Sequence, residues 1–133
     1  NAMSAEFKNK NVLIVDDSIV RGTTSKEIVQ MAKDAGANKV FFTSAAPPVR
    51  YPHVYGINMP NRDELIAHDR TISEIADHLE IDNLVYQSVE SLRKSIIGDS
   101  PIKGLEMSCF TGDYVTGTVN QEYLNWVENE YKS

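Results

Sequence analysis

The chain has 133 residues, a formal net charge of −6, and 41% hydrophobic and 24% charged residues. This length and composition fit one globular domain with a buried core, and no apolar run approaches the ~18 residues that cross a bilayer. The absence of a Lys/Arg cluster argues against nucleic acid as a partner. Cys109 is the only cysteine, which excludes an internal disulfide and predicts a cytoplasmic location.

The amino end carries little structural signal of its own. Asn1-Ala2 before Met3 is typical of the remnant of a cleaved tag, and the first ten residues lack the apolar core of a signal peptide. We therefore expect a tag remnant and lead-in over 1–10, a binding segment over 11–118 and a carboxy-terminal helix over 119–133. The early start of the binding segment predicts that the chain is a fragment of a longer protein.

The first half of the chain alternates strand and helix patterns. Val12–Val15 is a continuous apolar run, which predicts a strand buried on both faces of a parallel sheet. Helical spacing over Thr24–Ala35 predicts a helix that ends at Gly36 in the left-handed conformation. A second strand is expected at 40–42. The apolar face of the helix should consist of Ile28, Met31, Ala32 and Ala35.

The second half continues this alternation after a proline-rich irregular stretch, 44–62. Asn61 is expected to cap a short helical piece through Ala67, and a capping box at 71–74 opens the next helix. A third strand is expected at 84–86, and further helices at 88–97 and 121–131. The inward faces of these three helices should be Ile72, Ile75, Ala76 and Leu79; Val89, Leu92 and Ile96; and Leu124, Val127 and Tyr131. The order predicts an α/β fold, a parallel sheet with flanking helices on both faces.

A polar loop at 16–25 follows the first strand, the place where ligands of open parallel sheets bind. Two adjacent carboxylates, Asp16 and Asp17, can accept hydrogen bonds from ribose hydroxyls and hold a hard cation. Gly22 lets the backbone approach a ligand, and the following hydroxyl and N–H groups favour an anion at the helix start. These groups together predict a ribose 5-phosphate site rather than a solvated turn. The candidate binding residues are Asp16, Asp17, Ser18, Arg21, Gly22, Thr23, Thr24 and Ser25.

The segment Val12–Thr24 resembles the signature that binds phosphoribosyl pyrophosphate (PRPP) in type I phosphoribosyltransferases. The resemblance implies a Rossmann-like half-domain of that fold. Further segments narrow the resemblance to the glutamine PRPP amidotransferases, and they are 44–52, 54–60, 64–67 and 110–114. Together they cover most of the chain, from about residue 11 to residue 118.

This resemblance implies a reaction for the whole enzyme. In the family, an amino-terminal glutaminase domain releases ammonia, and the carboxy-terminal domain uses it to displace pyrophosphate from PRPP. The product is 5-phosphoribosylamine, in the first committed step of purine biosynthesis. Asp16 and Asp17 would bind the ribose hydroxyls and Mg²⁺, and 18–25 would hold the 5-phosphate that purine nucleotide inhibitors share. The full-length enzyme is expected to be a homo-oligomer that binds neither nucleic acid nor membrane.

Two departures from the family pattern limit what this chain should do alone. It resembles only the carboxy-terminal part of the enzyme, without the glutaminase domain. We therefore expect no catalytic residue here and no formation of phosphoribosylamine by the isolated chain. Some family members carry a [4Fe–4S] cluster on a Cys-x-x-Cys pair, which reads Glu106-Met107-Ser108-Cys109 here. We therefore expect no iron–sulfur cluster and a buried, unreactive Cys109.

Two alternative functions share part of the pattern. Segments 12–18 and 57–61 also resemble response-regulator receiver domains, but Gly56 stands where the phosphoacceptor aspartate belongs, and the late Lys-Pro pair is missing. A PRPP-binding regulatory domain without catalysis is the other alternative. Arg50 is expected either to face the ligand or to lie on the surface. The histidines show no metal-ligand spacing and are His53, His68 and His78.

Overall fold

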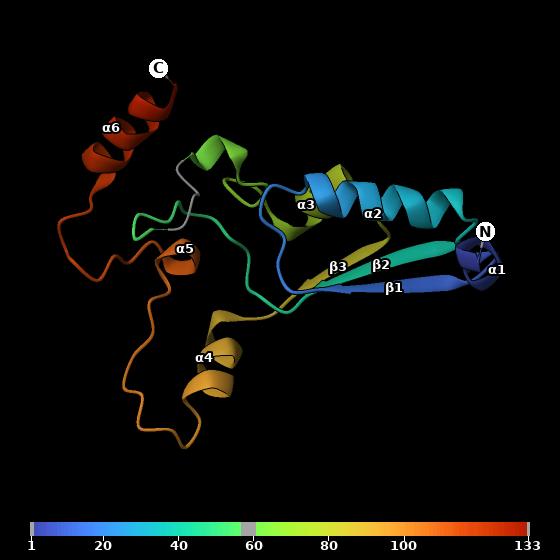
Figure 1. The fold of residues 1–133 in the computed structure, drawn as a ribbon, viewed down its shortest axis with the longest axis horizontal. Coiled ribbons are helices and arrows are strands. Elements are labelled where there is room, and N and C mark those ends of the chain that lie inside the picture. Colours follow the sequence, from blue (N-terminus) through green and yellow to red (C-terminus); the bar gives the residue numbers. More distant parts are fainter. Residues whose placement is uncertain (1, 57–60, 133) are drawn as a thin grey trace.

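The computed structural model describes residues 2–56 and 61–132 and contains a parallel three-stranded sheet (Figure 1). The strands are β1 (Asn11–Asp16), β2 (Lys39–Ser44) and β3 (Asn83–Tyr86), in the order β1-β2-β3. Asp16 pairs with Ser44, and Ser44 pairs with Tyr86, so all three strands end at one edge. The parallel sheet and its three strands confirm the sequence prediction.

Along the chain, helices precede, connect and follow these strands. They are α1 (Ala2–Phe7), α2 (Thr23–Asp34), the 3₁₀ helix η1 (Arg62–Glu64), α3 (Ile72–Leu79), α4 (Val89–Ile97), α5 (Ser108–Thr111) and α6 (Gln121–Lys132). The expected helix boundaries are confirmed to within one residue for α2, α4 and α6. α1 lies in the lead-in, for which the sequence pattern predicted no structure. None of the helices in the described ranges is long and apolar enough to cross a membrane.

Local caps explain where two of these helices begin and end. The Thr71 side chain accepts a hydrogen bond from the Glu74 N–H, and the Glu74 side chain accepts one from the Thr71 N–H, so the expected capping box is confirmed. Gly36 follows α2 with a φ of +90°, the left-handed conformation predicted for it. These signals are local, which is why the sequence identified them.

Helices α2 and α3 cover one face of the sheet and build the core against it (Figure 1). The sheet contributes Val40, Phe42 and Leu84, each at most 5% exposed, and α3 contributes Ile75 and Leu79. Complete burial of such a side chain stabilises the fold by roughly 1.5–3 kcal/mol. The inward residues of α2 are Ser25, Val29 and Ala32.

Two of the expected inward residues on these helices lie outward instead. Met31 on α2 is 53% exposed and Ile72 on α3 is 42% exposed, so both assignments are wrong. On α2 the buried positions are spaced four and three residues apart from Ser25, and Met31 falls outside that stripe. Ile72 stands at the first position of α3, before the helix packs on the sheet.

The other face of the sheet is bare, and the prediction of helices on both faces is wrong for the described residues. Leu13, Val15 and Val85 on that face are 61%, 69% and 55% exposed, so β1 is not buried on both faces. The helix that follows β3, α4, lies beyond the carboxyl ends of the strands rather than under them (Figure 1). For the same reason α4 buries no residue, and Ile96, expected inward, is 46% exposed.

The carboxy-terminal third packs through polar contacts rather than through the sheet. The N–H groups of Arg50 and Tyr51 donate to Cys109 O, and the Tyr114 hydroxyl donates to Pro52 O at 2.8 Å. Leu124 on α6 is 6% exposed, which confirms it as an inward residue. These contacts place 106–132 against the irregular stretch after β2, of which 57–60 lie outside the described residues.

Candidate functional site

A pocket of about 330 Å³ lies where β1 ends and α2 begins. Every candidate binding residue predicted from the sequence lines it, together with Val20, which the prediction omitted. The set is Asp16, Asp17, Ser18, Val20, Arg21, Gly22, Thr23, Thr24 and Ser25. The structure therefore gathers the predicted loop residues around one cavity, here called the loop pocket.

The acidic end of the loop pocket is organised by its own backbone. Asp16 Oδ1 accepts the Asp17 N–H at 2.8 Å, and the Ser18 hydroxyl donates to Asp17 Oδ1 at 3.4 Å. The carbonyl oxygens of Asp16 and Asp17 accept the N–H groups of Ala45 and Ala46, both at 2.9 Å. The loop after β2 thus fixes the backbone of both acidic residues at the edge of the sheet.

These two carboxylates supply only part of a magnesium site. No group of three or more His, Cys, Asp or Glu side chains suited to a metal occurs among the residues that the structure describes. Mg²⁺ requires six oxygen ligands and commonly keeps waters while it bridges substrate phosphates. Asp16 and Asp17 can supply oxygen ligands to a hard cation whose other ligands are water or phosphate oxygens.

The opposite end of the loop pocket is the first turn of α2. Gly22 stands at the N-cap with φ 80° and ψ −7°, and no side chain caps this helix. The first N–H groups of a helix have no partner within it, and the first turn of α2 has no acidic residue to compete for them. Ser25 is 3% exposed, which places it in the floor of the site. This geometry suits a phosphate group.

A second chain segment supports the loop pocket from outside. Arg21 Nε and Nη2 donate to Glu64 Oε2 at 3.3 and 3.2 Å. The Ile66 N–H donates to Val20 O at 3.0 Å, and a Cβ added to Gly22 would overlap the Ile66 side chain. The sequence analysis noted 64–67 only as part of the family resemblance and assigned Glu64 and Ile66 no role at the loop, because each lies more than 40 residues from its partner, Arg21 or Gly22.

Arg50 lies outside the loop pocket. Its Nη1 donates to Ala67 O at 2.7 Å and to Arg70 O at 2.8 Å. It lines a separate pocket of about 360 Å³ whose other lining residues are Tyr51, His68, Asp69, Arg70 and Thr71. Of its two expected roles, that of facing the loop ligand is not what the structure shows; Arg50 instead ties two backbone carbonyls together.

Glu106, at the first position of the segment 106–109, forms two hydrogen-bond contacts. His53 Nε2 lies 3.1 Å from Glu106 Oε2, and the Ser108 N–H donates to Glu106 Oε1 at 2.8 Å. Burial alone would raise the pKa of Glu106, but hydrogen bonds from Ser108 and the adjacent His53 hold it below its ordinary value. Cys109 is half-buried rather than fully buried, and this burial raises the pKa of its thiol.

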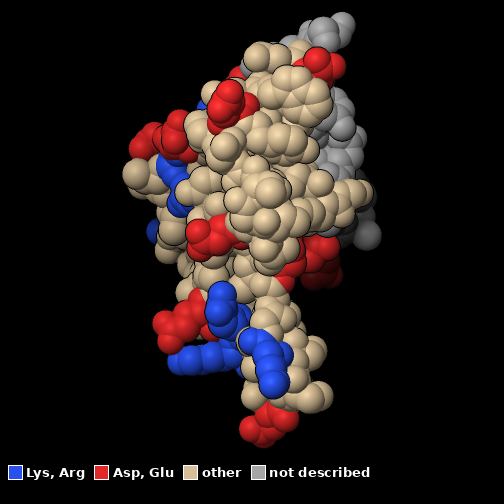
Figure 2. Space-filling view, turned by 90° about the vertical axis from the view of Figure 1, so that its left-hand side faces the viewer, with Lys and Arg blue, Asp and Glu red and all other residues tan. Residues whose placement is uncertain are grey.

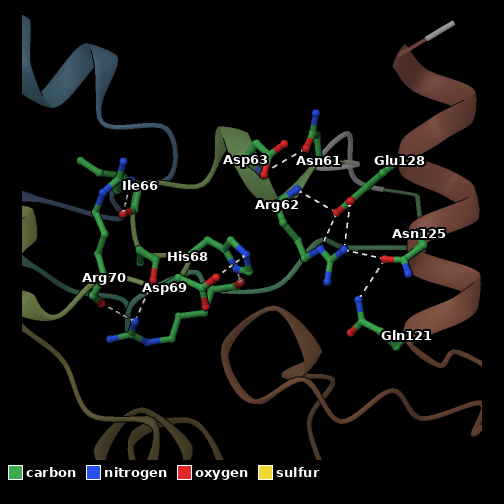
Figure 3. Close-up of polar contacts among 12 residues, drawn as sticks. Asn61, Arg62, Asp63, Ile66, His68, Asp69, Arg70, Gln121, Asn125 and Glu128 are labelled. Atoms are coloured by element: carbon green, nitrogen blue, oxygen red, sulfur yellow. Dashed lines mark hydrogen bonds and ion pairs between the residues drawn. The ribbon is translucent and has the colours of Figure 1, made fainter.

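Helix α6 is attached to η1 by a nearly buried ion pair (Figure 3). Arg62 Nε donates to Glu128 Oε1 at 2.6 Å and Arg62 Nη2 donates to Glu128 Oε2 at 3.0 Å, with side chains 19% and 10% exposed. Arg62 Nη2 also donates to Asn125 Oδ1 at 2.8 Å. The hydrogen bond from Arg62 is the main reason that the pKa of Glu128 lies below its ordinary value.

Charge on the surface is mixed. Figure 2 shows Lys and Arg side chains gathered at the lower end of one face, over α4, with acidic side chains beside them and across the upper part. A nucleic-acid-binding domain would present an extended basic face. In this view the Lys and Arg side chains form no such extended face and are mixed with acidic ones.

Relatives of known function resemble almost the whole chain. The amidophosphoribosyltransferase of Haemophilus influenzae is 53% identical over 131 residues, which are 98% of this chain and 26% of that protein. Those of Escherichia coli and Saccharomyces cerevisiae are 50% and 51% identical over 96% and 100% of the chain, again 26% of each relative. No family model matches the sequence. The chain thus spans about a quarter of the length of these relatives.

Solved structures give the same result. The glutamine PRPP amidotransferase from B. subtilis, complexed with ADP and GMP, superposes with a TM-score of 0.76 at 40% identity. The match covers 84% of this chain and 25% of that one. These relatives favour the phosphoribosyltransferase interpretation over the receiver interpretation. The chain is therefore homologous to a quarter-length segment of the amidophosphoribosyltransferases and has the type I phosphoribosyltransferase fold.

Proposed function

We propose that the chain is the carboxy-terminal part of the phosphoribosyltransferase domain of an amidophosphoribosyltransferase and that its loop pocket binds PRPP. One observation carries the proposal: all eight candidate binding residues line a single pocket at the carboxyl end of β1. The pocket joins two carboxylates to an uncapped helix start, and PRPP joins ribose hydroxyls to a 5-phosphate. The chemistry of the pocket therefore matches the two ends of this ligand.

In the proposed reaction of the longer protein, water hydrolyses glutamine to glutamate and ammonia, and the ammonia attacks C1 of the ribose. A C–N bond forms, the bond from C1 to pyrophosphate breaks, and pyrophosphate leaves with the electron pair while the ammonia nitrogen loses a proton. The products are 5-phosphoribosylamine, pyrophosphate and glutamate, and this is the first committed step of purine biosynthesis. This chain orients the sugar through Asp16 and Asp17 and anchors the phosphate through Gly22–Ser25.

Mg²⁺ is part of the proposal as an ion that enters with PRPP. Asp16 and Asp17 would contribute oxygen ligands or bind its waters, and the ion would neutralise charge on the leaving pyrophosphate.

Because the chain spans about a quarter of the length of its relatives, we propose that the activity belongs to the longer, homo-oligomeric protein with its glutaminase domain. Purine nucleotides carry a 5-phosphate and would compete for the same site. The lone Cys109 supports a cytoplasmic location.

Two conservative substitutions should impair the two ends of the loop pocket differently. Thr24→Val keeps the shape but removes a hydroxyl donor, so it should weaken PRPP and purine nucleoside 5′-monophosphates alike. The expected loss is about ten- to a hundredfold, since one hydrogen bond to a charged group contributes roughly 1.5–3 kcal/mol. Asp16→Asn removes one charge, so it should weaken Mg²⁺-dependent PRPP binding more than binding of a monophosphate. Isothermal titration calorimetry with the purified chain measures both.

Thr118→Val is the matched control, because Thr118 is exposed and lies outside the loop pocket. It should bind as the unmodified chain does. A Thr24→Val variant with unchanged stability and unchanged PRPP affinity would refute the phosphate assignment. If only Mg²⁺ binding depended on the loop, through Asp16 and Asp17, the receiver alternative would be favoured instead. A chain that bound PRPP while the longer protein released no pyrophosphate would favour a regulatory domain.

A further inference from the structure

The side chain of Ile66 occupies the space beside the Cα of Gly22. A Cβ added to Gly22 would overlap Ile66 Cδ1 and would lie 3.3 Å from Ile66 Cγ1. Ile66 is 2% exposed, and its N–H donates to the carbonyl of Val20 at 3.0 Å. The same residue therefore contacts the loop through both its backbone and its side chain.

A contact from outside the loop is needed to hold the backbone of Gly22 in one conformation. Its φ of +80° is one of many values that glycine adopts without cost, so its own chemistry does not select it. The next residues, Thr23 and Thr24, line the loop pocket, and the direction of their backbone N–H groups depends on the turn at Gly22. Packing of a buried, branched side chain against the Cα of Gly22 restricts that freedom.

Ile66 lies in the segment 62–70, and hydrogen bonds hold this segment at several points (Figure 3). Arg70 Nη1 donates to the Ile66 carbonyl at 3.0 Å, and Arg50 Nη1 donates to the Ala67 carbonyl at 2.7 Å. At the other end of the segment, Arg62 binds Glu128 of α6. A segment anchored at both ends is a rigid support for the loop that rests on it.

We propose that Ile66 is a positioning residue of the loop pocket, which holds Gly22 in the left-handed turn and so orders the N–H groups of the first turn of α2 for a 5-phosphate. The identity of the ligand rests on the proposed function, whereas the ordering of the loop does not. Ile66 touches no ligand in this role and acts through the backbone of Gly22.

The test compares three variants of the full chain: Ile66→Ala, Ile66→Val and, as a matched control, Ile75→Ala. Ile75 is fully buried on α3 in the same core, so its truncation removes a similar packing contribution without touching Gly22. Backbone amide signals of Gly22–Ser25 should broaden or multiply in Ile66→Ala and not in Ile75→Ala. Ile66→Val keeps the Cγ1 contact but loses Cδ1, so it should show a smaller effect than Ile66→Ala. Ribose 5-phosphate should bind Ile66→Ala about tenfold more weakly, the equivalent of fixing one backbone residue again.

Each outcome separates the two hypotheses. If the unmodified chain binds no ribose 5-phosphate or PRPP, the proposed function fails, and the amide signals still decide the role of Ile66. If loop signals and affinity in Ile66→Ala match those in Ile75→Ala, Ile66 is only a core residue and the inference is overturned. All measurements are made at a temperature where circular dichroism shows every variant folded.

Discussion

Replacing Gly22 by alanine should be the most damaging single change in the loop pocket. A side chain at φ +80° costs about 1–2 kcal/mol, and overlap with a buried side chain such as Ile66 costs about 1–3 kcal/mol more. We therefore expect the free energy of unfolding to fall by about 2–5 kcal/mol. Because the turn must distort to admit the methyl group, binding of ribose 5-phosphate should be lost as well.

Gly117→Ala separates the two causes of this loss. Gly117 has a φ of +67°, but nothing lies within 4 Å of a Cβ added there, so the variant carries backbone strain without overlap. Urea denaturation should show a smaller loss for Gly117→Ala and none of the loss in binding. In a double-mutant cycle, Ile66→Ala should reduce the cost of Gly22→Ala by removing the overlap. Normal ligand binding by Gly22→Ala would refute the tight contact between Gly22 and Ile66.

Removing Arg62 should be the most damaging change outside the pocket. Arg62→Ala leaves the carboxylate of Glu128, whose side chain is 10% exposed, without its cation. Loss of one member of a buried pair typically costs about 3–5 kcal/mol, so α6 should detach from η1 or the whole chain should lose most of its stability. Urea denaturation at pH 7 measures the loss, and α6 amide exchange shows where it occurs.

The pH dependence of this pair has a definite sign. The pKa of Glu128 is lowered in the folded chain, chiefly by the hydrogen bond from Arg62. A lowered carboxyl pKa contributes stability above the unfolded-state value, 4.5, and that contribution disappears as the pH falls through the lower folded value. The unmodified chain should therefore lose stability below about pH 4.5, with Glu106 acting in the same direction. Arg62→Ala should lack the Glu128 part of this dependence.

An exposed pair provides the control for both measurements. Lys94 and Glu90 on α4 form an ion pair at 3.0 Å with side chains 75% and 79% exposed. Such surface pairs contribute little because water screens them, so Lys94→Ala should leave the stability and its pH dependence nearly unchanged. Equal effects of Lys94→Ala and Arg62→Ala would show that burial of the Arg62–Glu128 pair has no special importance.

Features that depend on neighbours in sequence were predictable, and those that depend on distant packing were not. The loop pocket, the Thr71 cap and the turn at Gly36 each arise within about ten residues, so their patterns are visible in the chain. Ile66 meets Gly22 and Glu128 meets Arg62 only after folding, because 44 and 66 positions separate the members of each pair.

The bare face illustrates the same limit from the other side. The apolar pattern of Val12–Val15 correctly predicted a strand, but the exposure of Leu13 and Val15 depends on where α4 lies after β3. A continuous apolar run indicates a strand whose side chains are usually buried on both faces. It does not indicate which element covers them.

Leu13, Val15 and Val85 already contact water in the folded chain, so unfolding hydrates little additional apolar surface at these positions. The heat-capacity change of unfolding grows with newly hydrated apolar area, and so does the sensitivity to denaturant. A chain whose sheet has one solvent-exposed face should therefore unfold with a smaller heat-capacity change than a chain of equal length with helices packed on both faces of its sheet. Its free energy of unfolding consequently follows a flatter curve against temperature.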